Sequence, residues 1–304
     1  MKHVIYPALF SLLILAGCGG GSALPSIEAD SPTSAESVSE YRVLASTTIL
    51  ADIVQNVAGN RVKVQSLIAA GVDPHSFQPA PQDLARISEA DLLIFNGAGY
   101  ESFQRILVEN SGSRGQVVEA AAGLSSGSEA VDPHFWLDPN NVFVYVENIR
   151  EGLTHLDPDG AAEFKSNADA YIAELTALDA WITDQVNQIP AEKRLLVTNH
   201  EAFGYFAERY GFTVVGTVIE SFSTDASPSA QQLATLIDQI EASRAPAIFL
   251  DAGDNPALAE QIAEETGIRV VTDLHLESLT DDAPAATYLD MMEHNVTLIV
   301  DALK

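Results

Sequence analysis

Residues 81–95 read PQDLARISEADLLIF, and this stretch indicates the fold class. Pro81 suits the first turn of a helix that continues to Glu89, because a proline there gives up no backbone hydrogen bond. Asp91–Phe95 follows at once as a short, nearly continuous apolar run, which is typical of a strand buried on both faces. A helix that leads directly into a doubly buried strand is one unit of a parallel sheet covered by helices.

The same alternation recurs on both sides of this stretch. Further strands are predicted at 42–46, 62–68, 195–198, 213–219, 247–250 and 268–272, and further helices at 47–58, 201–210, 228–243, 256–266 and 285–303. Alternating strands and helices imply parallel sheets with helices on their faces. The predicted class is α/β, with two similar lobes, each a mainly parallel sheet flanked by helices.

A long helical region separates the two groups of strands. Asp138 and Pro139 predict a helix start, and this helix runs to about His155. After Pro158 a second helical pattern continues to about Ile189, with apolar residues three or four positions apart. These apolar residues are Leu175, Leu178, Ile182, Val186 and Ile189. A helix of this length indicates a rigid connection that joins the two lobes.

The N-terminus has the layout of a secretory signal. Lys2 precedes an apolar stretch, Val4–Leu15, which is too short to span a bilayer comfortably. The sequence LAGC, which ends at Cys18, resembles a bacterial lipobox. We therefore predict a lipoprotein signal peptide over 1–18, ending at a lipidated Cys18. This places the protein outside the cytoplasm, anchored by lipid to the cell membrane on the periplasmic side or at the cell surface.

Changes in composition set the predicted domain boundaries. Residues 19–40 are rich in Gly, Ser, Pro and acidic side chains, which predicts a flexible tether. The rest of the chain divides into an N-terminal α/β lobe (41–157), a linking helix (158–190) and a C-terminal α/β lobe (191–304).

Charge and cysteine content narrow the classes of function. The chain carries 43 acidic and 15 basic residues, a formal net charge of −28. Nucleic-acid binding is not expected, because it requires a basic surface, whereas an acidic surface raises the local concentration of cations. Cys18 is the only cysteine, so neither a disulfide nor a thiolate zinc site can form within the chain. Any metal must be bound by His, Asp or Glu.

Three histidines occupy similar places in this pattern. His75 (in GVDPH) follows a predicted strand, His134 (in DPHFW) precedes a predicted helix, and His200 (in TNHE) follows a strand of the second lobe. Ligands of open α/β sheets bind at the carboxyl ends of strands, and a ligand shared by all three would lie between the lobes. Spacing alone leaves two interpretations: solvated loop histidines, or one metal site without a local motif such as HExxH.

Four stretches in order resemble the metal-binding receptors of ABC importers, the zinc and manganese solute-binding proteins of the ZnuA/TroA-like, cluster A-I family. They are GVDPHSFQPAPQDL, DPHFWLDPNN, TNHEAFGYFAERYGF and YLDMMEHNVTLIVDAL. The resemblance extends from about Tyr41 to the end of the chain. It implies a receptor and not an enzyme, with an ABC permease and its ATPase as partners, and we expect a monomer.

The resemblance also implies the ligands. The histidines that bind metal in the family match His75, His134 and His200. The fourth family ligand is usually an Asp, in a segment that matches LHLESL here, and the aligned residue is Glu277. Because Glu is one methylene longer than Asp, the sequence does not determine whether the Glu277 carboxylate takes the place of the usual Asp. Asp273 and His275 lie close enough in the chain to be the fourth ligand instead.

The donor types favour zinc. Three neutral imidazoles and one carboxylate suit tetrahedral zinc, whereas manganese prefers more oxygen ligands. Zinc-specialised members of the family often carry a His-rich loop, and the matching stretch 123–129 has no histidine, which argues for manganese. Zinc is the predicted cargo, with manganese or both metals as the alternative.

The predicted function is the capture of a divalent metal ion between two lobes and its delivery to a membrane permease. Two other classes stay open. A zinc hydrolase would use Glu201 beside His200 as its base, but a fourth protein ligand would close the position that catalysis needs. A surface adhesin lipoprotein would function without His75.

Overall fold

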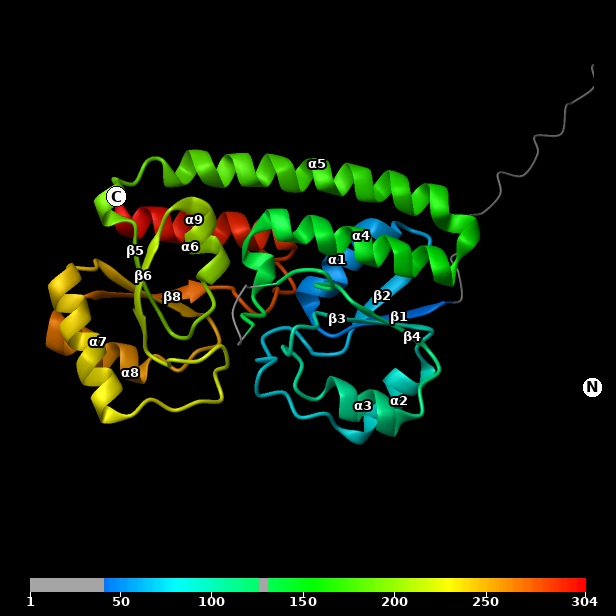
Figure 1. Ribbon diagram of the computed structural model, residues 1–304, viewed down its shortest axis with the longest axis horizontal. Coiled ribbons are helices and arrows are strands. Elements are labelled where there is room, and N and C mark those ends of the chain that lie inside the picture. Colours follow the sequence, from blue (N-terminus) through cyan, green and yellow to red (C-terminus); the bar gives the residue numbers. More distant parts are fainter. Residues whose placement is uncertain (1–40, 126–130) are drawn as a thin grey trace, which may run out of the picture. The chain divides into compact units, whose positions relative to one another are not determined.

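The structure, a computed structural model, describes residues 41–125 and 131–304. The predicted signal peptide with Cys18, the tether and most of the stretch 123–129 lie outside these residues. The described chain forms two parallel sheets of four strands each, flanked by helices, which confirms the predicted α/β class (Figure 1). The lobe boundaries drawn from the sequence stay predictions.

The first sheet has the strand order β2-β1-β3-β4. Its strands are β1 (Arg42–Ala45), β2 (Lys63–Ser66), β3 (Leu92–Phe95) and β4 (Gln116–Glu119). In the register of the sheet, Val43 lies beside Val64 on one side and Leu92 on the other. The chain passes from β1 to β2 on one side and from β3 to β4 on the other. The crevice beyond the carboxyl ends of β1 and β3, where the strand order reverses, is therefore the expected ligand position.

The second sheet repeats this topology with the order β6-β5-β7-β8. Its strands are β5 (Leu195–Thr198), β6 (Thr213–Thr217), β7 (Ala247–Asp251) and β8 (Arg269–Leu274). All of its neighbouring strands are parallel. By the same rule, the carboxyl ends of β5 and β7 mark the ligand position of this lobe.

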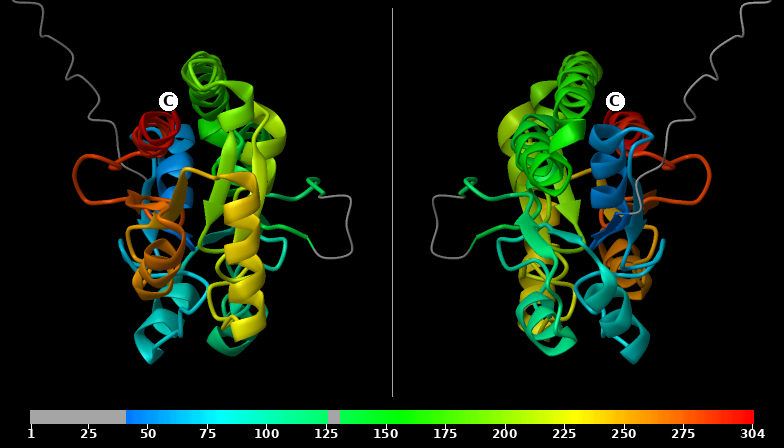
Figure 2. Two further views of the ribbon diagram at one scale, coloured as in Figure 1. Left: turned by 90° about the vertical axis from the view of Figure 1, so that its left-hand side faces the viewer. Right: turned by 90° about the vertical axis from the view of Figure 1, so that its right-hand side faces the viewer.

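Helices cover both faces of each sheet (Figures 1 and 2). They are α1 (Thr48–Ala58), α2 (Pro81–Glu89), α3 (Gln104–Ser111), α4 (Pro139–Leu156), α5 (Ala161–Val186), α6 (Gly204–Tyr210), α7 (Ala230–Ser243), α8 (Ala257–Thr266) and α9 (Tyr288–Leu303). Helices α2 and α3 bury their apolar sides on one face of the first sheet. Helices α7 and α8 do the same on the second sheet.

Helix α5 lies within the region 158–190 predicted as the linking helix, and it extends over both lobes (Figure 1). Its buried side includes Phe164, Tyr171, Leu175, Ile182 and Val186. These residues belong to one apolar cluster that also contains buried residues of α1, α4, α9 and both sheets. Because this core is continuous, the two lobes share it. None of the described helices is long and apolar enough to cross a membrane.

Several boundaries differ from the predicted ones. Helix α7 begins at Ala230 and not at Pro228, because Ser229 caps it: the Ser229 hydroxyl accepts from the Gln232 N–H, and the Gln232 side chain accepts from the Ser229 N–H. Helix α9 begins at Tyr288, where Thr287 caps it. The sequence analysis did not predict α3 or β4, since each is short and lacks a full repeat of the periodic pattern.

Candidate metal centre

Four side chains meet in the crevice between the lobes. His75 lies in the loop after β2, His134 lies just before the short helix Phe135–Leu137, and His200 follows β5. Glu277 follows β8. All four are buried, with exposed fractions of 8%, 0%, 1% and 5% in chain order. Burying so many polar groups costs free energy unless they are paired or bind a metal ion.

The donor atoms of these four residues all lie within 4.8 Å of one another. The Nε2 atom of His134 lies 3.3 Å from Nε2 of His75 and 3.3 Å from Nε2 of His200. Oε1 of Glu277 lies 3.2 Å from Nε2 of His200, 3.4 Å from that of His134 and 3.8 Å from that of His75. A regular tetrahedron with zinc–ligand distances of about 2.0–2.1 Å has edges of about 3.3–3.4 Å. Four of the five distances match these edges and the His75–Glu277 distance is longer, so the donors surround a position of the size of a small metal ion.

Each Asp-Pro-His sequence folds into the same local turn. The carboxylate of Asp73 accepts from the backbone N–H of His75 at 2.9 Å, and that of Asp132 accepts from the N–H of His134 at 2.9 Å. Asp side chains commonly form such turns with the backbone two residues later. The repeated motif therefore sets the backbone direction from which each imidazole enters the crevice.

Asp132 also orients the ring of His134. Its Oδ1 lies 2.7 Å from Nδ1 of His134, so in the neutral ring Nδ1 carries the hydrogen and Nε2 is left with a lone pair for a metal ion. Metal-binding histidines commonly donate a hydrogen bond to a carboxylate from the ring nitrogen that does not bind the metal. Nδ1 of His200 has no hydrogen-bond partner among the described residues.

Hydrogen bonds to the backbone of Leu276 fix the segment that carries Glu277. Asp251, at the end of β7, accepts from the N–H of Leu276 at 2.5 Å. The indole N–H of Trp136 donates to the Leu276 carbonyl at 2.9 Å. The carboxylate of Glu277 then receives a hydrogen bond from the Tyr100 hydroxyl at 2.5 Å. The sequence analysis missed the roles of Asp251, Tyr100 and Asp132; for Asp132 alone, the repeated Asp-Pro-His motif was a usable signal.

The charged groups of this centre shift one another's pKa values. Burial works to lower the pKa of His134, but the Glu277 carboxylate and the hydrogen bond that His134 donates to Asp132 outweigh it and raise this pKa to about 9. Burial works to raise the pKa of Glu277, but the histidines hold it well below its usual value. Burial and the nearby carboxylates raise the pKa of Tyr100. At neutral pH a proton therefore occupies His134, and an incoming cation must displace it.

The structure separates Glu277 from the two alternative fourth ligands. Among the described residues, the potential metal-binding group is His75, His134, His200 and Glu277. Asp273 is exposed, and the ring of His275 faces that of His294, with centroids 5.5 Å apart. Glu201, the base of the hydrolase interpretation, is also exposed.

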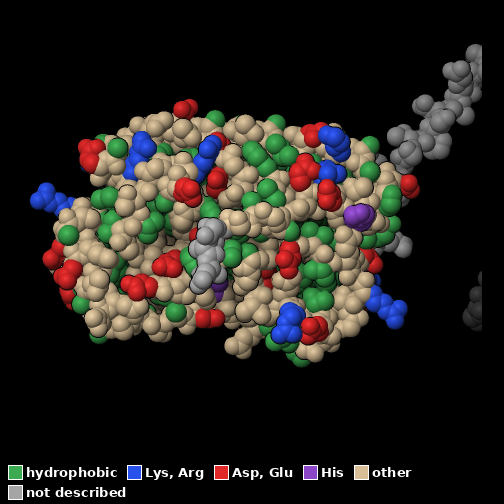
Figure 3. Space-filling view, viewed as in Figure 1, with side chains coloured by type: hydrophobic (Ala, Val, Ile, Leu, Met, Phe, Trp, Pro, Cys, Tyr) green, Lys and Arg blue, Asp and Glu red, His purple; other side chains and the backbone are tan. Residues whose placement is uncertain are grey.

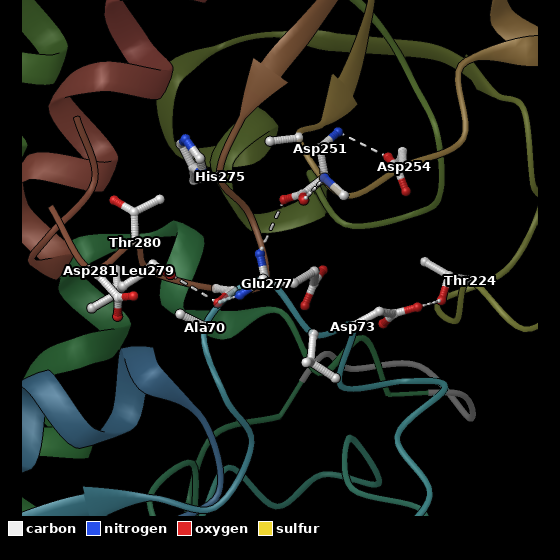
Figure 4. A pocket seen from close by; sticks show the side chains of 15 residues that line it. Ala70, Asp73, Thr224, Asp251, Asp254, His275, Glu277, Leu279, Thr280 and Asp281 are labelled. Carbon is white, nitrogen blue, oxygen red and sulfur yellow. Dashed lines mark hydrogen bonds between the residues drawn. The ribbon is translucent and has the colours of Figure 1, made fainter. Parts of the chain in front are cut away.

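A cavity of about 390 Å³ opens beside Glu277 (Figure 4). Four aspartates line it: Asp73, Asp251, Asp254 and Asp281. Across it the Thr224 hydroxyl of the second lobe donates to the Asp73 carboxylate of the first at 2.6 Å. Acidic side chains are also spread over the outer surface, where Lys and Arg are few (Figure 3). The cavity thus leads from an acidic surface to Glu277, which is the one of the four donors that lines it.

Comparison with known proteins points to metal binding. A family model described as "ZnuA: Zinc-uptake complex component A periplasmic" matches residues 43–302. The manganese-binding lipoprotein MntA of Halalkalibacterium halodurans is 34% identical over 310 residues, which cover 100% of this chain and 99% of the relative.

The similar solved structures are also those of metal-binding proteins. A Mn-bound periplasmic metal-binding protein from Candidatus Liberibacter asiaticus is 31% identical, with a TM-score of 0.78 over 87% of this chain and 100% of that one. The periplasmic zinc-binding protein TroA of Treponema pallidum has a TM-score of 0.81 at 28% identity, over 87% of this chain and 99% of that one. Both likenesses extend over the two lobes described above.

Proposed function

Because this chain belongs to the ZnuA family of metal-binding components of ABC importers, we propose that it captures one zinc ion and delivers it to a membrane permease. His75, His134, His200 and Glu277 would bind the ion. The matching family confirms the resemblance drawn from the four sequence motifs. The assignment of these ligands and of zinc is our proposal.

The spacing of the four donors carries the proposal. Edges of 3.2–3.4 Å around His134 and His200 suit a zinc ion with four ligands. Three of the donors are imidazole nitrogens, which zinc accepts readily, whereas manganese is better served by carboxylate, carbonyl and water oxygens. A shell closed by four protein ligands also argues against a hydrolase, which needs an open position for water.

The acidic cavity would serve as the route to the centre. Its aspartates attract cations from solution and exclude anions. The cavity reaches Glu277 directly, so an ion entering it meets the carboxylate before the more deeply buried His134. The final step releases the proton of His134 and exchanges the remaining water of the ion for imidazole nitrogens.

The cellular setting of the proposal follows from the family and the N-terminal sequence. A permease and an ATPase would receive and import the ion, and the chain would work outside the cytoplasm. Lipid attached to Cys18 would anchor it, with 19–40 as the tether. The lipid anchor, the tether and the monomeric state rest on the sequence alone.

Manganese is the second candidate cargo. The observation in its favour is that a relative covering this whole chain is named for manganese, and that a similar solved structure holds it. A receptor for manganese, or for both metals, would use the same four side chains with added water.

The test is metal selection by the full-length chain, purified in detergent and stripped of metal. It is incubated with equal, excess amounts of zinc and manganese, freed of unbound ions, and analysed by mass spectrometry for both elements. We expect one zinc per chain. The His275→Ala variant should do the same, whereas Glu277→Ala should lose metal during washing. One manganese per chain would establish the second candidate, and no retained metal would refute the proposal.

A further inference from the structure

We infer that Tyr100 fixes Glu277 as a ligand through one oxygen only, and so makes the centre select zinc over manganese. The inference rests on the proposed function, because it concerns the same four donors. Tyr100 is a positioning residue in this account, since it acts on the metal through Glu277.

The two carboxylate oxygens of Glu277 have different partners. Oε1 faces the three imidazoles, at 3.2 Å from Nε2 of His200 and 3.4 Å from that of His134. Oε2 instead accepts the hydroxyl hydrogen of Tyr100 at 2.5 Å. A carboxylate held in this way offers one oxygen to a metal ion, because turning the second oxygen toward the ion would break a buried hydrogen bond.

The ring of Tyr100 is packed so that its hydroxyl stays in place. It is 4% exposed. It makes edge-to-face contacts with the ring of His75 and with that of Trp136, each with centroids 5.0 Å apart. Since a packed aromatic ring has few alternative positions, the hydroxyl cannot follow a carboxylate that rotates toward the metal.

The backbone before Tyr100 is also tightly determined. The residues after β3 include Gly97, Ala98 and Gly99, all with positive φ angles of 82°, 53° and 82°. Ala98 is not a glycine, so this conformation costs free energy that the surroundings must offset. The buried Glu101 does so, accepting from the Ser46 hydroxyl at 2.5 Å and the Asn96 N–H at 2.7 Å. The loop therefore holds the hydroxyl at a defined place.

The number of donor atoms connects this geometry to metal choice. With Glu277 bound through one oxygen, the protein supplies three nitrogens and one oxygen, which complete a zinc shell. Manganese gains more from additional oxygen ligands. Losing the Tyr100 hydroxyl would leave Oε2 buried without its donor, so it would turn to the ion and supply a fifth ligand atom. That change favours manganese relative to zinc.

The experiment compares the wild type with Tyr100→Phe, which keeps the ring and removes the hydroxyl. Affinities for zinc and for manganese are measured by competition with a chromophoric chelator, and X-ray absorption spectra count the ligands of each bound ion. We expect the ratio of zinc to manganese affinity to fall about tenfold, the usual size of such supporting contacts, and the shell to gain one oxygen. Tyr210→Phe is the control, because it loses a partly buried hydroxyl whose 2.9 Å hydrogen bond goes to Asp179, away from the metal centre.

The outcomes separate the inference from the proposed function. If the wild type binds zinc through four ligands while Tyr100→Phe keeps both the shell and the affinity ratio, the role of Tyr100 is refuted and the function stands. If the wild type binds no metal, the function itself fails. Should Tyr100→Phe not fold, the infrared carboxylate bands of the zinc-loaded wild type decide: a Glu277 carboxylate bound through both oxygens overturns the inference.

Discussion

Removing the Asp132 carboxylate should weaken metal binding although Asp132 is not itself one of the proposed metal ligands. Its Oδ1 accepts from both Nδ1 of His134, at 2.7 Å, and the His134 backbone N–H, at 2.9 Å. It is 7% exposed, so solvent cannot easily take over either role. Without the carboxylate the His134 ring can rotate, and in some of its conformers Nε2 points away from the metal ion.

The expected loss can be estimated from these two contacts. Losing the carboxylate behind a metal-binding imidazole typically lowers affinity about 10- to 100-fold, or about 1.4–2.8 kcal/mol. Asp132→Asn keeps an oxygen acceptor and loses the charge, so we expect about a tenfold loss. Asp132→Ala loses both and should approach a hundredfold loss.

The loss should also depend on pH. Asp132 helps to raise the pKa of His134 to about 9, and the proton on His134 competes with the metal. Its removal lessens that competition below pH 9, which partly offsets the lost orientation. The full loss should therefore appear at about pH 9.5, and a smaller one at pH 7.

The assay is a competition titration with a chelator at both pH values. The control is Asp169→Asn, which removes one negative charge from an exposed position on α5. Affinity of Asp132→Ala within twofold of the wild type at pH 9.5 would refute the orienting role. A loss greater at pH 7 than at pH 9.5 would refute the account of proton competition.

Other predictions concern the ligands, the pH, the fold and the anchor. Glu277→Ala should lower metal affinity far more than His275→Ala in the same titration; equal losses would show that the fourth ligand is misassigned. Metal needs neutral imidazole, and His134 keeps its proton up to about pH 9, so affinity should rise from pH 6.5 to 9; calorimetry in two buffers of different ionisation enthalpy should detect proton release, and a flat profile would contradict it. Asp179 accepts hydrogen bonds from α4 and α6 side chains, so Asp179→Ala should lower the free energy of unfolding by about 1–3 kcal/mol, measured by urea denaturation; an unchanged midpoint would exclude this role. Cys18→Ala should release the protein from membranes, and a variant that still sediments with lipid would disprove lipidation there.

Sequence patterns were sufficient for most of the fold because its strands are buried on both faces. Leu92–Phe95 is apolar at every position, and such a run is visible without any structure. Gln116–Glu119 was missed because only every second residue is half-buried at this sheet edge. The start of α7 was placed too early because Ser227 and Ser229 both suit a cap, and only the reciprocal bond with Gln232 selects one.

The candidate site was predictable in part. The resemblance to the family singled out the three histidines and Glu277, and in the structure their donor atoms lie within 4.8 Å of one another. Their supporting residues could not be found in the same way. Tyr100 and Glu277 are far apart in the chain, and no local pattern shows that one donates to the other. Such contacts depend on how the two lobes share one core.

The central claim is that three imidazoles and Glu277 bind one zinc ion. The most direct measurement is a crystal structure grown with equal amounts of zinc and manganese, with diffraction data on both sides of the zinc absorption edge. The account predicts one zinc peak at about 2.0–2.1 Å from Nε2 of His75, His134 and His200 and from one oxygen of Glu277. A peak at another place, a shell without Glu277, or a manganese ion in the centre would contradict it.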